Sequence, residues 1–246
     1  MTSKEIFSRT ELLVGADGMA KLAAARVAVF GVGGVGSWCA EALVRSGIRD
    51  LTIVDSDTVS VTNINRQAMA LTTTVGRPKV DTLRDRLLAI NPEAEIKAVR
   101  KIYCEETAGE FDFGKYDAVV DCIDSLKDKI TLIMRASASP ARFYSALGAG
   151  LKVDPTKIRV APFWEVRGCP LGSALRKKMR REGKEPAKPF LCVYDDEVLP
   201  NKGEPEDPSG PSGGSTSKAV VNGTLAHITG IFGFTLAGLV ISDVLK

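Results

Sequence analysis

A glycine-rich turn is the first group of residues in this sequence with a spacing suited to chemistry. Gly31, Gly33, Gly34 and Gly36 stand between a short apolar segment and a segment with helical character. Glycines let the backbone approach a phosphate closely, and the helix that follows presents N–H donors at its positive end. Asp55 ends the next apolar segment, where a carboxylate can accept a hydrogen bond from a ribose hydroxyl. The spacing predicts a nucleotide site; the alternative is that the glycines serve only helix–strand packing.

Three polar clusters further along the chain indicate which kind of nucleotide binds. They are Asn63 to Gln67, which includes Arg66, then Gly76 to Lys79, and then Asp121 to Asp124. An arginine and a lysine together balance the charge of a triphosphate better than that of a diphosphate bridge. A carboxylate at the end of a strand, close to phosphates, suits Mg²⁺. We therefore expect ATP and Mg²⁺, with the α-phosphate open to attack.

Each of these side chains also has a purely structural explanation. The alternatives are a surface salt bridge for Arg66, solvation for Lys79 and, for Asp124, a cap on the helix that follows it. Their occurrence together, in this order, favours the ATP site.

The elements that position these residues follow from the alternation of apolar and turn segments. Strands are expected at 26–30, 51–54, 96–99, 118–120 and 143–146, and helices at 37–46, 78–90 and 127–137. Strand, glycine turn, helix and strand in that order make a βαβ unit, which requires parallel strands. The fold class is therefore α/β, with a Rossmann-like, mostly parallel sheet and helices on both faces.

The chain changes character at Gly150. We expect residues 1–150 to form an ATP-binding core and residues 151–246 to form a C-terminal extension packed on that core. The extension contains a basic helix, a mobile loop at 200–217 and a final apolar helix at 225–245. The last segment is long enough to cross a membrane, but polar residues interrupt it. We expect a buried core helix, no membrane span, and a core position for His227.

Composition excludes several classes of protein. Apolar residues form 44% of the 246 residues, which is too much for a disordered chain. Five cysteines are too few for a disulfide scaffold, and reduced thiols suggest the cytoplasm. Cys39 and Cys122 are expected in the core, while Cys169 and Cys192 are candidates for a reactive thiol, with inert packing favoured for both.

Charge is unevenly distributed along the chain. The net charge is +3, and all of it arises after Gly150. Between Arg167 and Lys188 the local charge is +6, the kind of cluster that attracts a phosphate backbone. A solvated helix face is the alternative. We expect Arg176, Lys177 and Lys178 to contact RNA, and the acidic stretch after residue 194 either to fold against this helix or to flank the substrate entrance.

Taken together, these motifs resemble the superfamily of ubiquitin-activating-like adenylyltransferases. That resemblance implies a ribose ligand at Asp55 and phosphate ligands at Gly34, Asn63, Arg66 and Lys79, with Asp57 beside them and Mg²⁺ at Asp124. It also implies a homodimer, because the arginine matching Arg9 reaches the ATP site of the partner subunit. The structural alternative for Arg9 is an exposed arginine on a loose terminus.

One branch of the superfamily is more similar, the tRNA threonylcarbamoyladenosine dehydratases. The resemblance covers nearly the whole chain and is carried by Phe7 to Leu13, Thr62 to Gln67, Ile90 to Pro92, Gly148 to Gly150, Asp154 to Lys157 and Cys169 to Leu171. It implies ATP-dependent cyclisation of N6-threonylcarbamoyladenosine next to the tRNA anticodon, through adenylation of the threonyl carboxylate. Some relatives take part in sulfur relay through a cysteine before the last helix, and this chain has no cysteine after Cys192.

Two rival functions stay open. The first is activation of the C-terminal glycine of a ubiquitin-like or sulfur-carrier protein. Many enzymes of that kind hold zinc with two Cys-x-x-Cys pairs, and this sequence contains no such pair. The second is an NAD(P)-dependent oxidoreductase, which the combination of Arg66, Lys79 and Asp124 disfavours.

Overall fold

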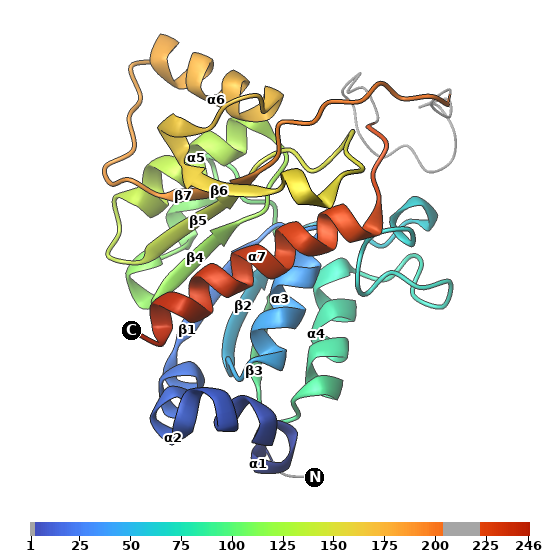
Figure 1. Cartoon of the computed structure of the whole chain (residues 1–246), viewed down its shortest axis with the longest axis vertical. Helices are drawn as coiled ribbons and strands as arrows, with labels where there is room; N and C mark the ends of the chain where they lie inside the picture. Colours follow the sequence, from blue (N-terminus) through green and yellow to red (C-terminus); the bar gives the residue numbers. More distant parts are fainter. Residues whose placement is uncertain (1–2, 204–221) are drawn as a thin grey trace.

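The computed structural model describes residues 3–203 and 222–246, and a seven-stranded sheet runs through its centre (Figure 1). The strand order is β3-β2-β1-β4-β5-β7-β6. All neighbouring strands are parallel except β6, which runs antiparallel to β7 at one edge. The strands are β1 (Arg26–Phe30), β2 (Asp50–Val54), β3 (Glu95–Val99), β4 (Ala118–Asp121), β5 (Arg142–Ala146), β6 (Arg159–Pro162) and β7 (Leu191–Tyr194). The predicted α/β, mostly parallel fold is confirmed.

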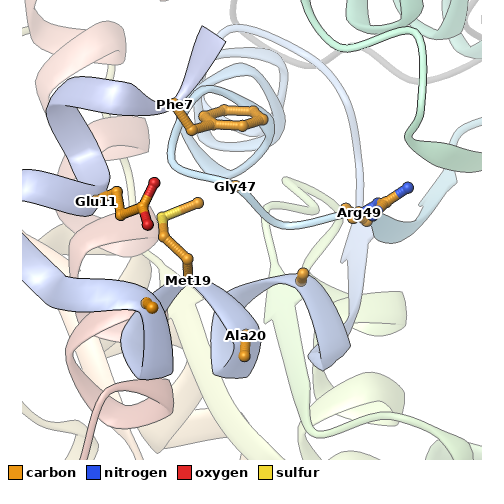
Figure 2. Close-up of a pocket in the computed structure, with 8 residues that line it drawn as sticks. Phe7, Glu11, Met19, Ala20, Gly47 and Arg49 are labelled. Atoms are coloured by element: carbon orange, nitrogen blue, oxygen red, sulfur yellow. The ribbon is translucent and has the colours of Figure 1, made fainter. Parts of the chain in front are cut away.

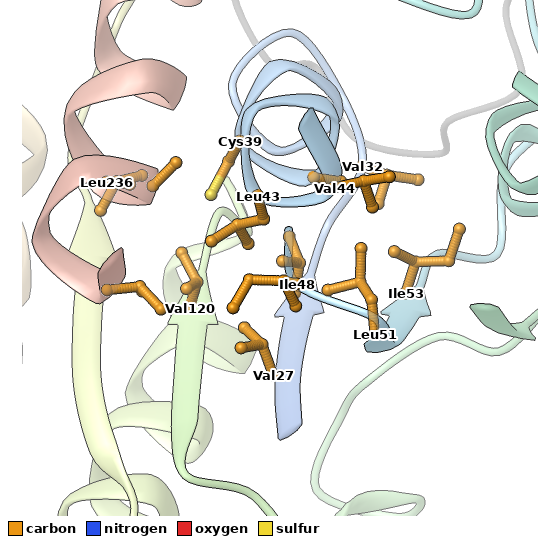
Figure 3. Close-up of a cluster of buried hydrophobic side chains, with 14 of the residues drawn as sticks. Val27, Val32, Cys39, Leu43, Val44, Ile48, Leu51, Ile53, Val120 and Leu236 are labelled. Atoms are coloured by element: carbon orange, nitrogen blue, oxygen red, sulfur yellow. The ribbon is translucent and has the colours of Figure 1, made fainter. Parts of the chain in front are cut away.

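Helices cover both faces of the sheet, because alternate residues of each central strand point to opposite sides. In β1, Val27 and Val29 join the core cluster that contains the inner face of α3, while Ala28 and Phe30 join the cluster on the other side. Figure 3 shows part of the first cluster, including Leu43 and Val44 of α3 and Val120 of β4. The first face carries α3 (Gly36–Arg45), α4 (Lys79–Ile90) and α7 (Ala226–Val244), and the second carries α5 (Leu126–Ser137) and α6 (Pro170–Arg181).

The closing helix α7 lies across α3 (Figure 1). By length and composition alone, this helix could cross a membrane. Phe232, Leu236 and Val240 are fully buried in the core cluster, however. At Gly233 a side chain would lie 2.5 Å from the carbonyl oxygen of Val35, so only glycine allows this approach to α3. Packing inside the protein thus accounts for the apolar sequence of α7.

Two helices at the N-terminus were not predicted, α1 (Ser3–Ile6) and α2 (Ser8–Ala24). Gly15 breaks the helical geometry within α2 with a φ of 73°, which also disrupts the regular spacing of apolar residues that identifies a helix from sequence. Strand β7 was missed as well. Within the extension, a 3₁₀ turn, Pro155–Lys157, leads into β6. Most of the expected loop at 200–217 lies outside the described residues.

Residues on both sides of Gly150 build the same sheet. Strand β7 pairs with β5 through Tyr144 and Leu191, and β6 extends the sheet beyond it. Tyr144 also donates a hydrogen bond to Asp243 near the end of α7. The extension therefore completes the core and supplies part of the wall of the cleft described next.

Candidate active site

A cleft of about 730 Å³ opens at the carboxyl ends of the parallel strands, the edge where open α/β sheets bind ligands. Segments following β1, β2, β3, β4 and β5 line it, and the extension contributes Leu171, Asn222 and Thr224. The predicted residues that line it are Gly31, Gly33, Gly34, Asp55, Asp57, Asn63, Arg66, Lys79 and Asp124. The structure thus brings together side chains that are up to 93 residues apart in sequence.

The glycine turn divides into two kinds of position. Gly31 has a φ of 82°, and a Cβ there would lie 2.8 Å from the Cys122 carbonyl oxygen, so glycine is needed for the turn itself. At Gly33 a Cβ would have no neighbour nearer than 3.9 Å, which leaves that side of the turn open to a ligand. Gly36 does not line the cleft. A Cβ at Gly36 would lie 1.8 Å from the Gly31 carbonyl oxygen, so its role is packing within the turn.

Asp55 is held in place by the turn it faces. Its Oδ2 accepts a hydrogen bond from the Val32 amide at 2.8 Å, and its Oδ1 accepts one from the Asp57 amide at 2.9 Å. Both carboxylate oxygens are therefore oriented by backbone donors before any ligand arrives. A ribose hydroxyl can still approach, because each oxygen has a second lone pair.

Lys79 is fixed at the opposite wall of the cleft. The backbone at Asp57 accepts a hydrogen bond from the Lys79 amide, and the Lys79 Nζ donates to Asp57 Oδ2 at 2.7 Å. The Lys79 side chain is only 8% exposed, whereas that of Asp57 is 64% exposed. The lysine is thus paired with Asp57 rather than solvated, at a position that lines the cleft.

Arg66 sits on a segment that is docked against α3. Trp38 Nε1 donates to the Arg66 carbonyl oxygen at 2.9 Å, and Arg66 Nη1 donates to the Thr62 carbonyl oxygen at 2.9 Å. Burial lowers the pKa of the Arg66 guanidinium, and the charge of Asp124 offsets part of that effect. No carboxylate of the described residues lies within salt-bridge distance of Arg66, so the surface salt bridge is excluded there.

A buried ion pair lies under the loop that carries Asp124. Lys129 Nζ is 2.8 Å from Asp121 Oδ2, and both side chains are 0% exposed. Lys129 also donates to the Ile123 carbonyl oxygen, while Asp121 accepts from the Ile123 amide. Ser145 donates to Asp121 at 2.7 Å. The two peptide groups of Ile123, just before Asp124, are therefore both held by hydrogen bonds to this ion pair.

Asp124 itself is exposed at the cleft. The helix cap that was the structural alternative for Asp124 is made instead by Ser125, whose Oγ accepts from the Asp128 amide. Mg²⁺ in nucleotide sites commonly takes one or two carboxylates together with phosphates and water. An exposed carboxylate facing an ATP-sized cleft fits that pattern, and within residues 3–203 and 222–246 no group of three or more metal-ligating side chains competes with it.

The cleft also contains residues that the sequence did not single out for a role. Lys101, Ile102 and Tyr103 line it directly after β3, and Gln67 lines it next to Arg66. The rule that parallel strands present their carboxyl ends at one edge would have found the first three. Asn222 and Thr224 carried no such signal, because they reach the cleft through a tertiary contact in which Asn65 Nδ2 donates to the Thr224 carbonyl oxygen.

All five cysteines are free thiols. Cys39, Cys169 and Cys192 are buried, and Cys122 is partly buried at the cleft. Burial raises the pKa of the Cys39, Cys122 and Cys192 thiols, which disfavours the reactive thiolate. Inert packing is therefore the role that the structure favours for the two extension cysteines.

Two positions differ from expectation. His227 is exposed and its Nε2 lies 2.9 Å from the Val153 carbonyl oxygen, so the predicted core position is wrong. Arg176 is buried, donates to the Phe163 carbonyl oxygen and stacks over the Phe163 ring, so it is not available to RNA. The amphipathic spacing of α6 places this arginine on its inner face.

Arg9 lies outside the cleft of its own chain. It is exposed on α2, which packs against Gly47 and Arg49 just before β2 begins, at the amino end of the strands. Figure 1 shows α1 and α2 at this end of the sheet, opposite the carboxyl ends of the strands. Any contact of Arg9 with an ATP site must therefore involve another copy of the chain.

The parallel sheet, the glycine turn and the carboxylate-and-cation cleft define an α/β nucleotide-binding protein of the Rossmann type. Residues 7–246 match the ThiF family, and the chain belongs to that family.

Three relatives show how far the similarity extends. The chain is 34% identical over 242 residues to the tRNA threonylcarbamoyladenosine dehydratase of Haemophilus influenzae, covering 94% of this chain and 89% of the relative. It is 44% identical over 178 residues to the Bacillus subtilis protein of the same name, covering 72% and 70%. The crystal structure of the Escherichia coli tRNA N6-threonylcarbamoyladenosine dehydratase in complex with ATP superposes with a TM-score of 0.83 at 31% identity, covering 98% and 94%.

Proposed function

We propose that this protein uses ATP to cyclise N6-threonylcarbamoyladenosine in tRNA, with loss of water. The observation that carries the proposal is the similarity to dehydratases over nearly the full chain, extension included. The extension supplies one wall of the cleft through Leu171, Asn222 and Thr224, so the part of the chain that encloses the substrate is the part shared with those relatives.

The chemistry follows from the positions of the cleft residues. A threonyl carboxylate oxygen attacks the α-phosphorus of ATP, the bond to the bridging oxygen breaks, and pyrophosphate leaves. Arg66 and Lys79 would balance charge on the phosphates, and their orientation by partners within the chain supports this role because it lowers the cost of reorganisation. Mg²⁺ held at Asp124 would neutralise further phosphate charge.

The second step needs no covalent enzyme intermediate. A nucleophilic group within the same modification attacks the activated carbonyl, AMP leaves with the carboxylate oxygen, and the proton of the nucleophile is released. Because nucleophile and electrophile belong to one nucleoside, proximity accounts for much of the rate. The reaction is thus of the ligase type in its use of ATP. The inaccessible thiols on the extension give no support to a sulfur-relay partner, and none is part of this proposal.

We further propose that the protein works as a homodimer in the cytoplasm. Leu12 and Leu13 are 88% and 87% exposed on α2, one turn from Arg9. A hollow of about 370 Å³ beside them is lined by Phe7, Met19 and Arg49 (Figure 2). A second copy covering this apolar face would remove it from water and bring Arg9 to a cleft other than its own. The free thiols suit a reducing compartment.

The proposed reaction can be tested directly on nucleosides. The protein is incubated with ATP, Mg²⁺ and tRNA bearing threonylcarbamoyladenosine, the tRNA is digested, and the nucleosides are analysed by mass spectrometry. Loss of one water from the modified nucleoside is expected with the wild-type protein and not with Asp124→Ala. An unchanged mass with the wild-type protein would contradict the proposal.

A further inference from the structure

Helix α6 has one exposed face and one buried face. Gly172, Leu175, Arg176 and Met179 are buried, and the positions between them are not. The exposed face begins with small residues and ends with cations, in the order Ser173, Ala174, Lys177, Arg180 and Arg181. The positive charge of this helix is therefore concentrated on one surface toward its C-terminal end.

Among the described residues, the acidic run Asp195 to Glu197 does not neutralise this surface. Asp196 pairs with Arg159 at 3.3 Å, and Glu197 pairs with Lys157 at 3.1 Å while accepting from the amides of Val153 and Asp154. Asp195 is buried 3.9 Å from Lys152. Residues 195–197 are thus paired with β6 and the segment just before it.

The exposed cations of α6 differ in whether they have partners. Lys178 pairs with Glu182, which also pairs with Lys184 just beyond the helix. Within the described part of the chain, Lys177, Arg180 and Arg181 have no carboxylate within 4.0 Å. Arg180 lies over the Trp164 ring, 5.2 Å from its centroid, which holds the guanidinium beside the helix. These three cations remain available to an external anion.

The first turn of α6 reaches the active site. Leu171 lines the cleft, and Gly172 lies against Leu147 of the cleft loop. At about 1.5 Å of rise per residue, Lys177 lies about 9 Å and Arg181 about 15 Å further along the helix axis. Figure 1 shows α6 extending away from the sheet at the edge where β7 and β6 lie. The cations therefore lie further along α6 than Leu171, the residue through which this helix lines the cleft.

We propose that the exposed face of α6, defined by Lys177, Arg180 and Arg181, is the docking surface for the phosphate backbone of the RNA whose modified nucleotide enters the cleft. This proposal rests on the proposed function and names where its substrate is held. The small residues Ser173 and Ala174 leave room for the RNA backbone between the cleft and the cations. Contacts to phosphates supply affinity that does not depend on the RNA sequence.

The test compares two double variants with the same change in charge. Lys177→Glu with Arg181→Glu reverses two exposed cations on α6, and both sites are exposed enough to keep the fold. Lys97→Glu with Lys115→Glu reverses two exposed cations near β3 and before β4, away from the α6 edge of the sheet. The binding of tRNA is measured by fluorescence anisotropy at several salt concentrations, and ATP binding is measured in parallel.

We expect the α6 variant to bind tRNA at least about tenfold more weakly at moderate salt, with the slope of log K against log salt smaller by about 1.5 to 2. The KM for tRNA rises, and the affinity for ATP stays unchanged. The control variant binds tRNA within about twofold of wild type. Equal losses in both variants, or none in the α6 variant, would overturn the proposal.

Failure here is distinguishable from failure of the proposed function. If the wild-type protein dehydrates the nucleoside while the α6 variant keeps the wild-type KM and affinity for tRNA, only the docking surface is wrong. If the wild-type protein leaves the nucleoside unchanged, the proposed function fails, and the binding comparison decides the docking surface by itself. Selective capture of an acidic protein instead of tRNA by the wild-type α6 face would also overturn the proposal.

Discussion

The cleft and the exposed face of α6 both present cations, but they hold them differently. Lys79 is paired with Asp57 and nearly buried, and Arg66 donates to the backbone of its own segment. Lys177 and Arg181 extend from a helix with no carboxylate within 4.0 Å in the described part of the chain. Groups that must meet one phosphate in one geometry are held by the fold, which avoids reorganisation during the reaction. Groups that attract a flexible backbone can remain free.

The largest effect is expected from removing the buried ion pair that holds the loop carrying Asp124. In Lys129→Met, Asp121 becomes a buried carboxylate without its counter-ion, and the Ile123 carbonyl oxygen loses its donor. We expect a loss of about 3–5 kcal/mol in the free energy of unfolding, measured by urea denaturation. The exposed Lys127→Met serves as control and should change stability by less than about 1 kcal/mol. Equal losses in the two variants would show that the pair does not hold the loop.

Asp124→Ala removes the exposed carboxylate while leaving the buried pair intact. We expect turnover to fall by about 10²- to 10³-fold, because charge on the phosphates is no longer offset as ATP reacts. The unfolding free energy should stay close to that of wild type, since Asp124 is exposed. Raising the Mg²⁺ concentration should not restore the rate. A variant with normal turnover would remove Asp124 from the proposed chemistry.

Arg9→Ala tests whether the cleft is completed by a second copy. We expect turnover to fall by about tenfold to a hundredfold with ATP binding retained in part. Mixing Arg9→Ala with Asp124→Ala chains should restore activity, because a mixed dimer contains one site with both residues. With random pairing about a quarter of wild-type sites are recovered. If the mixture showed only the average activity of the two variants, Arg9 would not complete the site of the partner chain.

Replacing Glu197 should have a smaller effect, on thermal stability, and that effect should depend on pH. Amide donors from Val153 and Asp154, together with Lys157, lower the pKa of its carboxyl to about 2. A lowered pKa in the folded state means that ionised Glu197 stabilises the fold above its ordinary pKa, near 4.5, and that this stabilisation is lost as pH falls toward 2. The Tm of Glu197→Gln should lie below that of wild type at pH 7, and the gap should narrow below pH 4.5. A gap that is constant from pH 7 to pH 3 would contradict this role.

The sequence predicted the nucleotide half of the fold well because each element there carries its own local signal. The apolar segments at 26–30 and 118–120 end in residues of the cleft, and the glycine turn marks where β1 gives way to α3. Strand β7 was missed because its identity depends on pairing with β5, which no local pattern records. Helix α2 was missed because Gly15 interrupts its periodicity.

The candidate site, like the fold, could be predicted from the sequence only in part. The strand-end residues Asp55 and Asp124 could be placed at one edge from topology alone. The role of Lys129 could not, because a lysine on a helix is ordinarily solvated and only the packed structure shows it fully buried. For the same reason Arg176 was taken for a surface cation, although its position on the inner face of α6 determines its role.

The central claim is that a substrate carboxylate is activated on the α-phosphate of ATP, and isotope transfer tests it most directly. The substrate tRNA is prepared with ¹⁸O in the threonyl carboxylate, reacted with ATP and the protein, and the nucleotide product is analysed by mass spectrometry. The account predicts AMP that carries one ¹⁸O atom for each nucleoside cyclised. Unlabelled AMP, or ADP as the product, would contradict it.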